Sequence, residues 1–147
     1  MVALLDWLIR YGHVASAAVW TGGYALLAVL LYPLLRREDR QVIARIAEPI
    51  ARMLSYAGTA TFAFGLLLIW RTRGYGNLLS GEWGMLVLGS VALGTFVLGL
   101  NDSALRPRLR RMANGGTGNA AQRLTLVALA ALLVAIGCMT RAVYAVA

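Results

Sequence analysis

The sequence predicts an all-α integral membrane protein, a four-helix bundle with both termini on the outer side of the membrane. Hydrophobic residues make up 60% of the 147 residues and charged residues only 14%, whereas roughly a quarter of a soluble domain is charged. The apolar residues also fall into four uncharged runs, each close to the ~20 residues that cross a bilayer as a helix. In lipid, the backbone of such long runs can form its hydrogen bonds only within a helix.

Each helix of the bundle follows from one run, so residues 1–147 are expected to form a single transmembrane domain. The first run is longer than the core of a signal peptide, and it is therefore expected to stay as the first helix. The connections that follow the second and third runs are rich in glycine, asparagine and serine, as turns are. In chain order, the runs 14–35, 53–70, 83–100 and 124–140 predict helices over residues 4–35, 42–72, 82–105 and 121–144.

Arginine decides the predicted orientation, because the chain has no lysine. Nine arginines fall in the first and third connections, and four fall in the second connection and near the two ends. Positively charged loops stay in the cytoplasm, so both termini are expected outside, in a multi-pass protein of the cell membrane. The nine are Arg36, Arg37, Arg40, Arg45, Arg106, Arg108, Arg110, Arg111 and Arg123; the four are Arg10, Arg71, Arg73 and Arg141.

The net charge of +8 also brings the chain into contact with anionic lipid headgroups. The lipid bilayer is therefore the expected partner. The basic stretch RPRLRRM has no aromatic or groove-reading side chains nearby, so we expect no nucleic-acid partner.

Small residues spaced four apart predict close helix packing. Such pairs let neighbouring helices approach each other in a membrane. They should therefore bring the third and fourth helices close to their neighbours. The pairs are Ser90 with Gly94, Thr95 with Gly99, and Ala131 with Ala135.

His13, the only histidine, stands at the head of the first apolar run. An ionisable group inside a membrane is costly and is therefore a candidate for function. The alternative is a histidine that only hydrogen-bonds a neighbouring helix, with the methionines serving as packing. If the first helix enters the hydrocarbon near Val14, the residues expected at the level of His13 include Arg71, Met85, Cys138, Met139 and Arg141.

One face of the first helix is a candidate wall for a flat pocket. His13, Ala17, Trp20 and Tyr24 recur at i, i+4, i+7 and i+11, which places them on one side of a helix. Gly23 is expected to leave space beside this stripe.

The run HVASAAVWTGGYALLAVLLYP resembles the opening helix of the copper-resistance D (CopD) family and of the related HemJ-type protoporphyrinogen oxidases. NDSALRPRL is similar to the end of the third CopD helix, and RTRGYGNLLSGEWGMLVL to the turn before that helix. The resemblance implies a prokaryotic membrane protein in which His13 ligates b-type haem or handles copper. Both relatives carry a lysine early in helix three, where this chain has Gly89 and Ser90. This difference leaves open whether the chain is an enzyme.

A b-type haem protein with a redox or electron-transfer role is the leading interpretation, because haem needs one strong axial ligand and a slot. His13 would bind the iron. The sixth position would be filled by Met85 or Met139, stay open, or receive a second His13 in a homodimer. The residues expected around the haem are Trp20, Gly23 and Tyr24 along its face and Arg71, Arg73 or Arg141 at its propionates.

Two alternatives stay open. A copper transport or resistance protein would hold Cu(I) through soft ligands, here His13, Met85, Cys138 and Met139. A non-catalytic subunit of a larger membrane complex would use His13 only as a structural residue.

Overall fold

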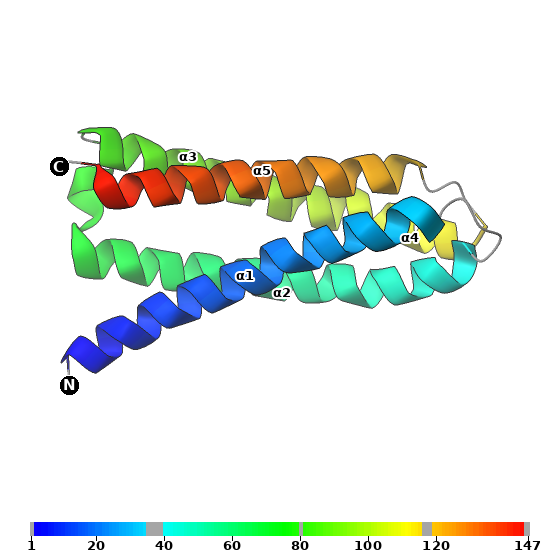
Figure 1. The fold of residues 1–147 in the computed structure, drawn as a ribbon, viewed down its shortest axis with the longest axis horizontal. Coiled ribbons are helices and arrows are strands. Elements are labelled where there is room, and N and C mark those ends of the chain that lie inside the picture. Colours follow the sequence, from blue (N-terminus) through cyan, green and yellow to red (C-terminus); the bar gives the residue numbers. More distant parts are fainter. Residues whose placement is uncertain (1, 35–39, 80, 116–118, 146–147) are drawn as a thin grey trace.

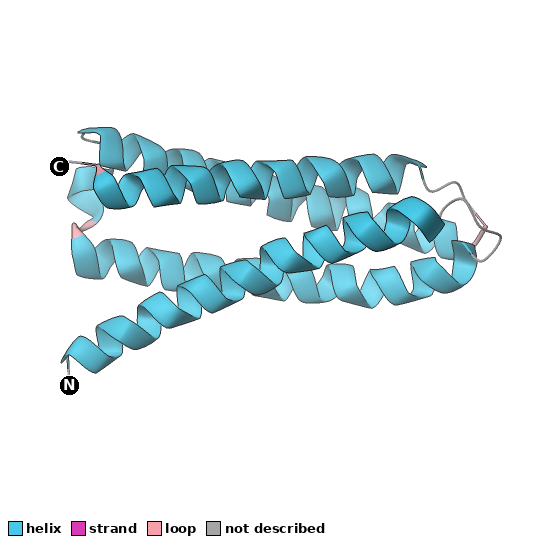
Figure 2. Ribbon diagram, viewed as in Figure 1, coloured by secondary structure: helices cyan, strands magenta, loops and turns pink. Residues whose placement is uncertain are grey.

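The computed structural model describes residues 2–34, 40–79, 81–115 and 119–145, and these form an all-α bundle (Figures 1 and 2). The all-α prediction is confirmed. Four long helical rods run side by side, and no strand occurs among the described residues. The elements are α1 (Val2–Leu34), α2 (Arg40–Thr72), the 3₁₀ turn η1 (Tyr75–Leu79), α3 (Gly81–Leu100), the π turn η2 (Asn101–Leu105), α4 (Arg106–Ala113) and α5 (Asn119–Tyr144).

The third rod is longer than the sequence predicted, because α3, η2 and α4 follow one another without a break. In η2 the backbone N–H of Arg106 donates to the carbonyl of Asn101, five residues earlier. Pro107 follows in the first turn of α4. Proline has no backbone N–H, so it cannot donate a hydrogen bond to the preceding turn. The wide turn thus lets the helix pass the proline and continue to Ala113, beyond the expected end at residue 105.

The helices associate as two pairs. α1 packs most extensively along α2, and α3 along α5, while contacts of α2 with α4 and of α1 with α5 join the pairs. Figure 1 shows both termini at one end of the bundle and α4 at the other. In Figure 1, α1 crosses α2 at an angle, and its N-terminal half splays away from the other helices. The ion pair of Asp6 with Arg71 still joins this half to α2.

Three helical segments of the described chain are long and apolar enough to cross a membrane: Ala44–Thr72, Gly81–Ala113 and Asn119–Tyr144. Large apolar side chains cover the outside of the bundle, and many small ones fill its centre. This distribution suits helices that contact lipid outside and approach one another closely inside. The fully buried alanines include Ala44, Ala51, Ala121 and Ala128.

Some of the predicted small-residue pairs lie where another helix packs on α3, and one pair faces outward. Ser90 donates to the carbonyl of Ala135 across the α3–α5 contact at 3.2 Å. A Cβ atom at Gly94 would stand 2.9 Å from the Phe62 ring, so this side chain of α2 packs directly on the α3 backbone there. At Gly99, by contrast, a Cβ atom would meet nothing within 4 Å, and Thr95 is exposed. The expectation of a close contact at that pair is wrong, because this face of α3 points away from the other helices.

Candidate functional site

α1 runs antiparallel to α2 in a fixed register, and this register positions the site. Residues early in α1 contact residues late in α2, and the two residue numbers of each contact add up to nearly the same sum. This constancy is expected for two antiparallel helices. At the glycines, a side chain of one helix packs directly against the backbone of the other. The pairs are Asp6 with Arg71, Gly12 with Phe64, Trp20 with Gly58, and Gly23 with Leu54.

His13 lies against α2 and is half-buried. Its Nδ1 is 2.9 Å from the carbonyl oxygen of Thr61. A carbonyl can only accept, so Nδ1 carries the hydrogen and Nε2 keeps its lone pair. Nε2 has no hydrogen-bond partner among the described residues. The ring rests on Gly65, where a Cβ atom would stand 3.1 Å from Cε1.

Two hydroxyl groups support this contact between α1 and α2. Thr61 Oγ1 lies 3.1 Å from Ser16 Oγ and donates to it. Ser16 in turn donates to the carbonyl of Gly12 at 2.7 Å, one turn earlier on α1. The ring of His13 is therefore oriented by a backbone acceptor within a small polar patch on an otherwise apolar interface.

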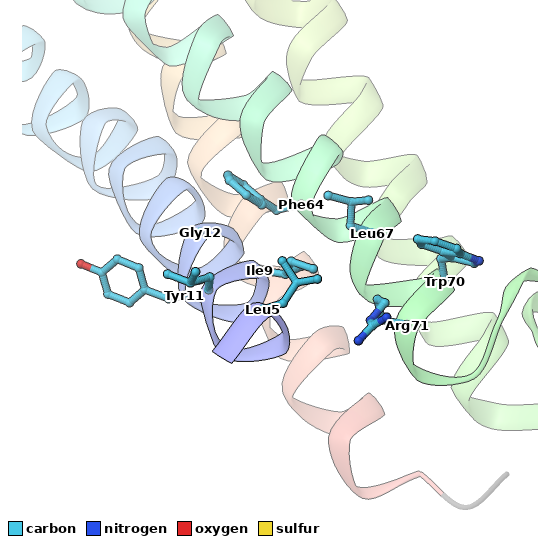
Figure 3. A pocket seen from close by; sticks show the side chains of 9 residues that line it. Leu5, Ile9, Tyr11, Gly12, Phe64, Leu67, Trp70 and Arg71 are labelled. Atoms are coloured by element: carbon cyan, nitrogen blue, oxygen red, sulfur yellow. The ribbon is translucent and has the colours of Figure 1, made fainter. Parts of the chain in front are cut away.

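An apolar groove extends between α1 and α2 from Gly12 and Phe64 toward Arg71 (Figure 3). Its volume is about 640 Å³, within the range of roughly 300–1,000 Å³ typical of small-molecule sites. Arg71 is the only charged residue of its lining, which consists of Leu5, Leu8, Ile9, Tyr11, Gly12, Phe64, Leu67, Trp70 and Arg71.

Arg71 does not share the level of His13, as the sequence had suggested. Its Nε lies 2.8 Å from Asp6 Oδ1, and Asp6 precedes His13 on α1 by about 10 Å of helix. Because α1 is already helical from Val2, His13 lies deeper in the bundle than expected. Arg71 stands at the outer end of the groove, and Gly12 lines its inner end. His13 follows Gly12 in the chain but does not itself line the groove.

The residues expected to line a pocket beside His13 pack the bundle core instead of facing open space. Trp20 is 3% exposed and Tyr24 is fully buried. The indole of Trp20 lies against Gly58, where a Cβ atom would stand 2.7 Å from it. Leu54 fills the space beside Gly23, since a Cβ atom there would collide with its Cδ2.

The candidate sulfur ligands lie on the other pair of helices. Met85 is 71% exposed on α3. Met139 packs on α5 in a small apolar cluster whose buried members are Ile69, Val87 and Ala142. Cys138, next to it, is a partly buried free thiol. No group of three or more His, Cys, Asp or Glu side chains in the described chain is placed to hold a metal ion.

Arg73 and Arg141, near the same end, are engaged as well. Arg141 Nε lies 2.8 Å from Glu82 Oε1. Arg73 lies over the Trp83 ring at 5.2 Å from its centroid and donates to the carbonyl of Ala145. These partners were not predicted from the sequence, although Asp6 and Glu82 stand at the same predicted end of the bundle as the arginines and could have suggested pairing.

No protein-family profile, curated protein or solved structure matches this chain. The resemblance of its motifs to the CopD and HemJ-type proteins therefore stays a prediction.

Proposed function

We propose that this protein binds b-type haem within the membrane, with His13 as axial ligand, in a redox or electron-transfer role. The observation that carries the proposal is the hydrogen bond from His13 Nδ1 to the carbonyl of Thr61. Histidines that ligate metals nearly always donate their second ring N–H in this way, which fixes the tautomer and the ring orientation. Nε2 is then free for the iron.

The apolar groove supports this proposal. It begins at Gly12 and Phe64, the neighbours of His13 and Gly65, and it ends at Arg71. Apolar walls suit a porphyrin face, and an arginine at the rim suits a propionate. Bound haem would supply a one-electron centre, and the chain's own residues would orient the imidazole and exclude water.

The positions of the sulfur atoms favour a single ligand from each chain. Met85 points to the outside of α3 and Met139 is packed against Val87 and Ala142. The sixth position would then stay open or receive His13 of a second copy in a homodimer. A Cu(I) site would need those sulfur atoms close to His13, so the same placement argues against the copper alternative.

We further propose four spans, with α1 as the first, in the cell membrane of a prokaryote with both termini outside. An electron-transfer role is preferred to an oxidase, because the lysine expected in helix three is absent.

The test is the pigment of the protein purified from haem-supplied cells. We expect a reducible Soret band that His13→Ala abolishes, while the melting profile keeps one transition, because a half-buried side chain contributes little to assembly. Leu67→Trp, which fills the groove without altering His13, should lower the haem content. Met85→Leu and Met139→Leu are the matched controls and should keep both haem and spectrum.

Three results would contradict the proposal. If His13→Ala keeps its full haem content, His13 is not the axial ligand. A colourless wild-type protein, whose His13→Ala variant only melts at a lower temperature, would make His13 a structural tie between α1 and α2. If the protein binds Cu(I), and the combined substitutions His13→Ala and Met139→Leu abolish that binding, copper and not haem is the cofactor.

A further inference from the structure

A polar groove opens between α2 and α4, toward the end of the bundle opposite the termini. Its volume is about 560 Å³. Three arginines line it, Arg52 from α2 and Arg106 and Arg110 from α4, and the hydroxyl side chains of Ser55 and Thr59 lie among them. Several guanidinium groups in one place suit a phosphate group, which accepts charge-assisted hydrogen bonds. The two hydroxyls already donate within the protein, Ser55 to Asp102 and Thr59 to the carbonyl of Ser55, so the arginines are the donors of the groove.

Two carboxylates organise these arginines without neutralising them. Glu48 lies 3.2 Å from Arg52, 3.8 Å from Arg106 and 3.1 Å from Arg110, and Asp102 lies 3.0 Å from Arg106. Three positive charges against two negative ones leave the cluster cationic. The Glu48 side chain is 16% exposed, whereas those of Arg52 and Arg110 are 52% and 60% exposed. The arginines therefore present their outer faces to the groove.

The depth of the groove matches a headgroup layer. Trp70 and Trp83 lie toward the terminal end of α2 and α3, and tryptophan is enriched at membrane interfaces. From Trp70 to Arg52 along α2 is about 27 Å of helix, and from Trp83 to Asp102 about 28 Å. The hydrocarbon core of a bilayer is about 30 Å thick. A membrane with one surface at the tryptophans thus has its other surface at the arginines.

From these observations we infer that the groove binds the phosphate headgroup of an anionic phospholipid. Met53 and Tyr56, next to the arginine on α2, are 50% and 70% exposed and offer an apolar surface to the acyl chains. Free phosphate would gain nothing from that surface, so a lipid is the fitting source. The site is separate from His13, and the two proposals stand or fall independently.

The experiment titrates delipidated protein in a neutral detergent with dioleoyl phosphatidylglycerol or dioleoyl phosphatidylcholine, and native mass spectrometry counts the bound lipids. We expect one phosphatidylglycerol held in preference to phosphatidylcholine, and a loss of about fivefold in affinity for each arginine removed in Arg52→Gln/Arg110→Gln. The matched control, Arg45→Gln/Arg111→Gln, removes the same charge from exposed positions of α2 and α4 outside the groove and should bind as the wild type does.

Asp102→Asn provides a test of opposite sign that does not depend on the arginine variants folding. It removes a competing negative charge and keeps an acceptor for Ser55 and Arg106, so phosphatidylglycerol should bind more tightly. Equal losses in the groove and control pairs, equal retention of phosphatidylcholine, or weaker binding to Asp102→Asn would each overturn the inference. Displacement of the lipid by millimolar inorganic phosphate would overturn the choice of a lipid.

Discussion

At the scale of single residues, the polar side chains buried in the bundle interior are unevenly satisfied. Trp20 Nε1, the Tyr24 hydroxyl and Asn101 Oδ1 are buried without a hydrogen-bond partner among the described residues. Asn101 differs from the other two, because its Nδ2 donates to the carbonyl of Ala51 and to Ser55 Oγ, both at 2.8 Å. An unpaired buried group costs stability, whereas a paired one ties two helices together.

This contrast predicts opposite effects of two substitutions on the haem-free protein. Tyr24→Phe removes a buried, unpaired hydroxyl and keeps the ring, so the melting temperature should stay the same or rise. Asn101→Ala removes two interhelical bonds between α2 and the π turn, and the free energy of unfolding should fall by about 1–3 kcal/mol. Thermal unfolding in detergent measures both. A fall for Tyr24→Phe as large as for Asn101→Ala would show that the hydroxyl has a partner.

At the scale of elements, glycines set how closely the helices approach. Trp20 of α1 enters the bundle between Gly58 of α2 and Gly94 of α3, and Phe62 of α2 also lies against Gly94. The indole and the phenyl ring occupy the volume that side chains at the two glycines would take. These contacts hold α1, α2 and α3 together near the middle of the bundle.

Gly94→Leu should therefore overpack the bundle. A longer side chain must displace Phe62, and beyond it Trp20, at a cost of about 1–3 kcal/mol. Gly99→Leu is the control on the same helix, because a Cβ atom there meets nothing within 4 Å. The expected result is a lower melting temperature for Gly94→Leu alone. If both variants melt like the wild type, α3 does not pack on α2 through Gly94.

At the scale of the whole molecule, charge is distributed unevenly between the two ends of the bundle. Both termini lie at one end, and α4 lies at the other (Figure 1). α4 carries Arg106, Arg108, Arg110 and Arg111 within eight residues. At the terminal end, Arg71 and Arg141 are paired with Asp6 and Glu82. Basic residues near short connections stay in the cytoplasm, so the end that carries α4 is expected to face inward.

This expectation is tested by a reporter fused after Ala147 or inserted after Asn114, next to α4. An alkaline phosphatase fusion, active only outside the cytoplasm, should be active at the C-terminus and inactive at residue 114. A fluorescent protein that folds only in the cytoplasm should show the reverse pattern. If one and the same reporter were active at both positions, α5, the helix between them, would not cross the membrane.

The sequence alone determined the class of this protein and most of its elements. Uncharged runs of bilayer length predicted each helix, because in lipid the backbone N–H and C=O groups of such a run can form hydrogen bonds only within a helix. The π turn at residues 101–105 was not predictable in this way, because it depends on how the chain passes Pro107. His13 could be singled out for the same reason as the helices: an imidazole in an apolar run needs a physical explanation.

Only the tertiary structure decided what surrounds His13. The register of α1 on α2 is set by contacts between residues about fifty positions apart, such as Gly12 with Phe64 and His13 with Thr61. A shift of a few residues would give the same hydropathy pattern but different neighbours. It is this register that places Arg71 beside Asp6 and His13 beside a carbonyl. Apolar patterning fixes which segments enter the membrane, whereas steric fit between facing side chains fixes where they meet.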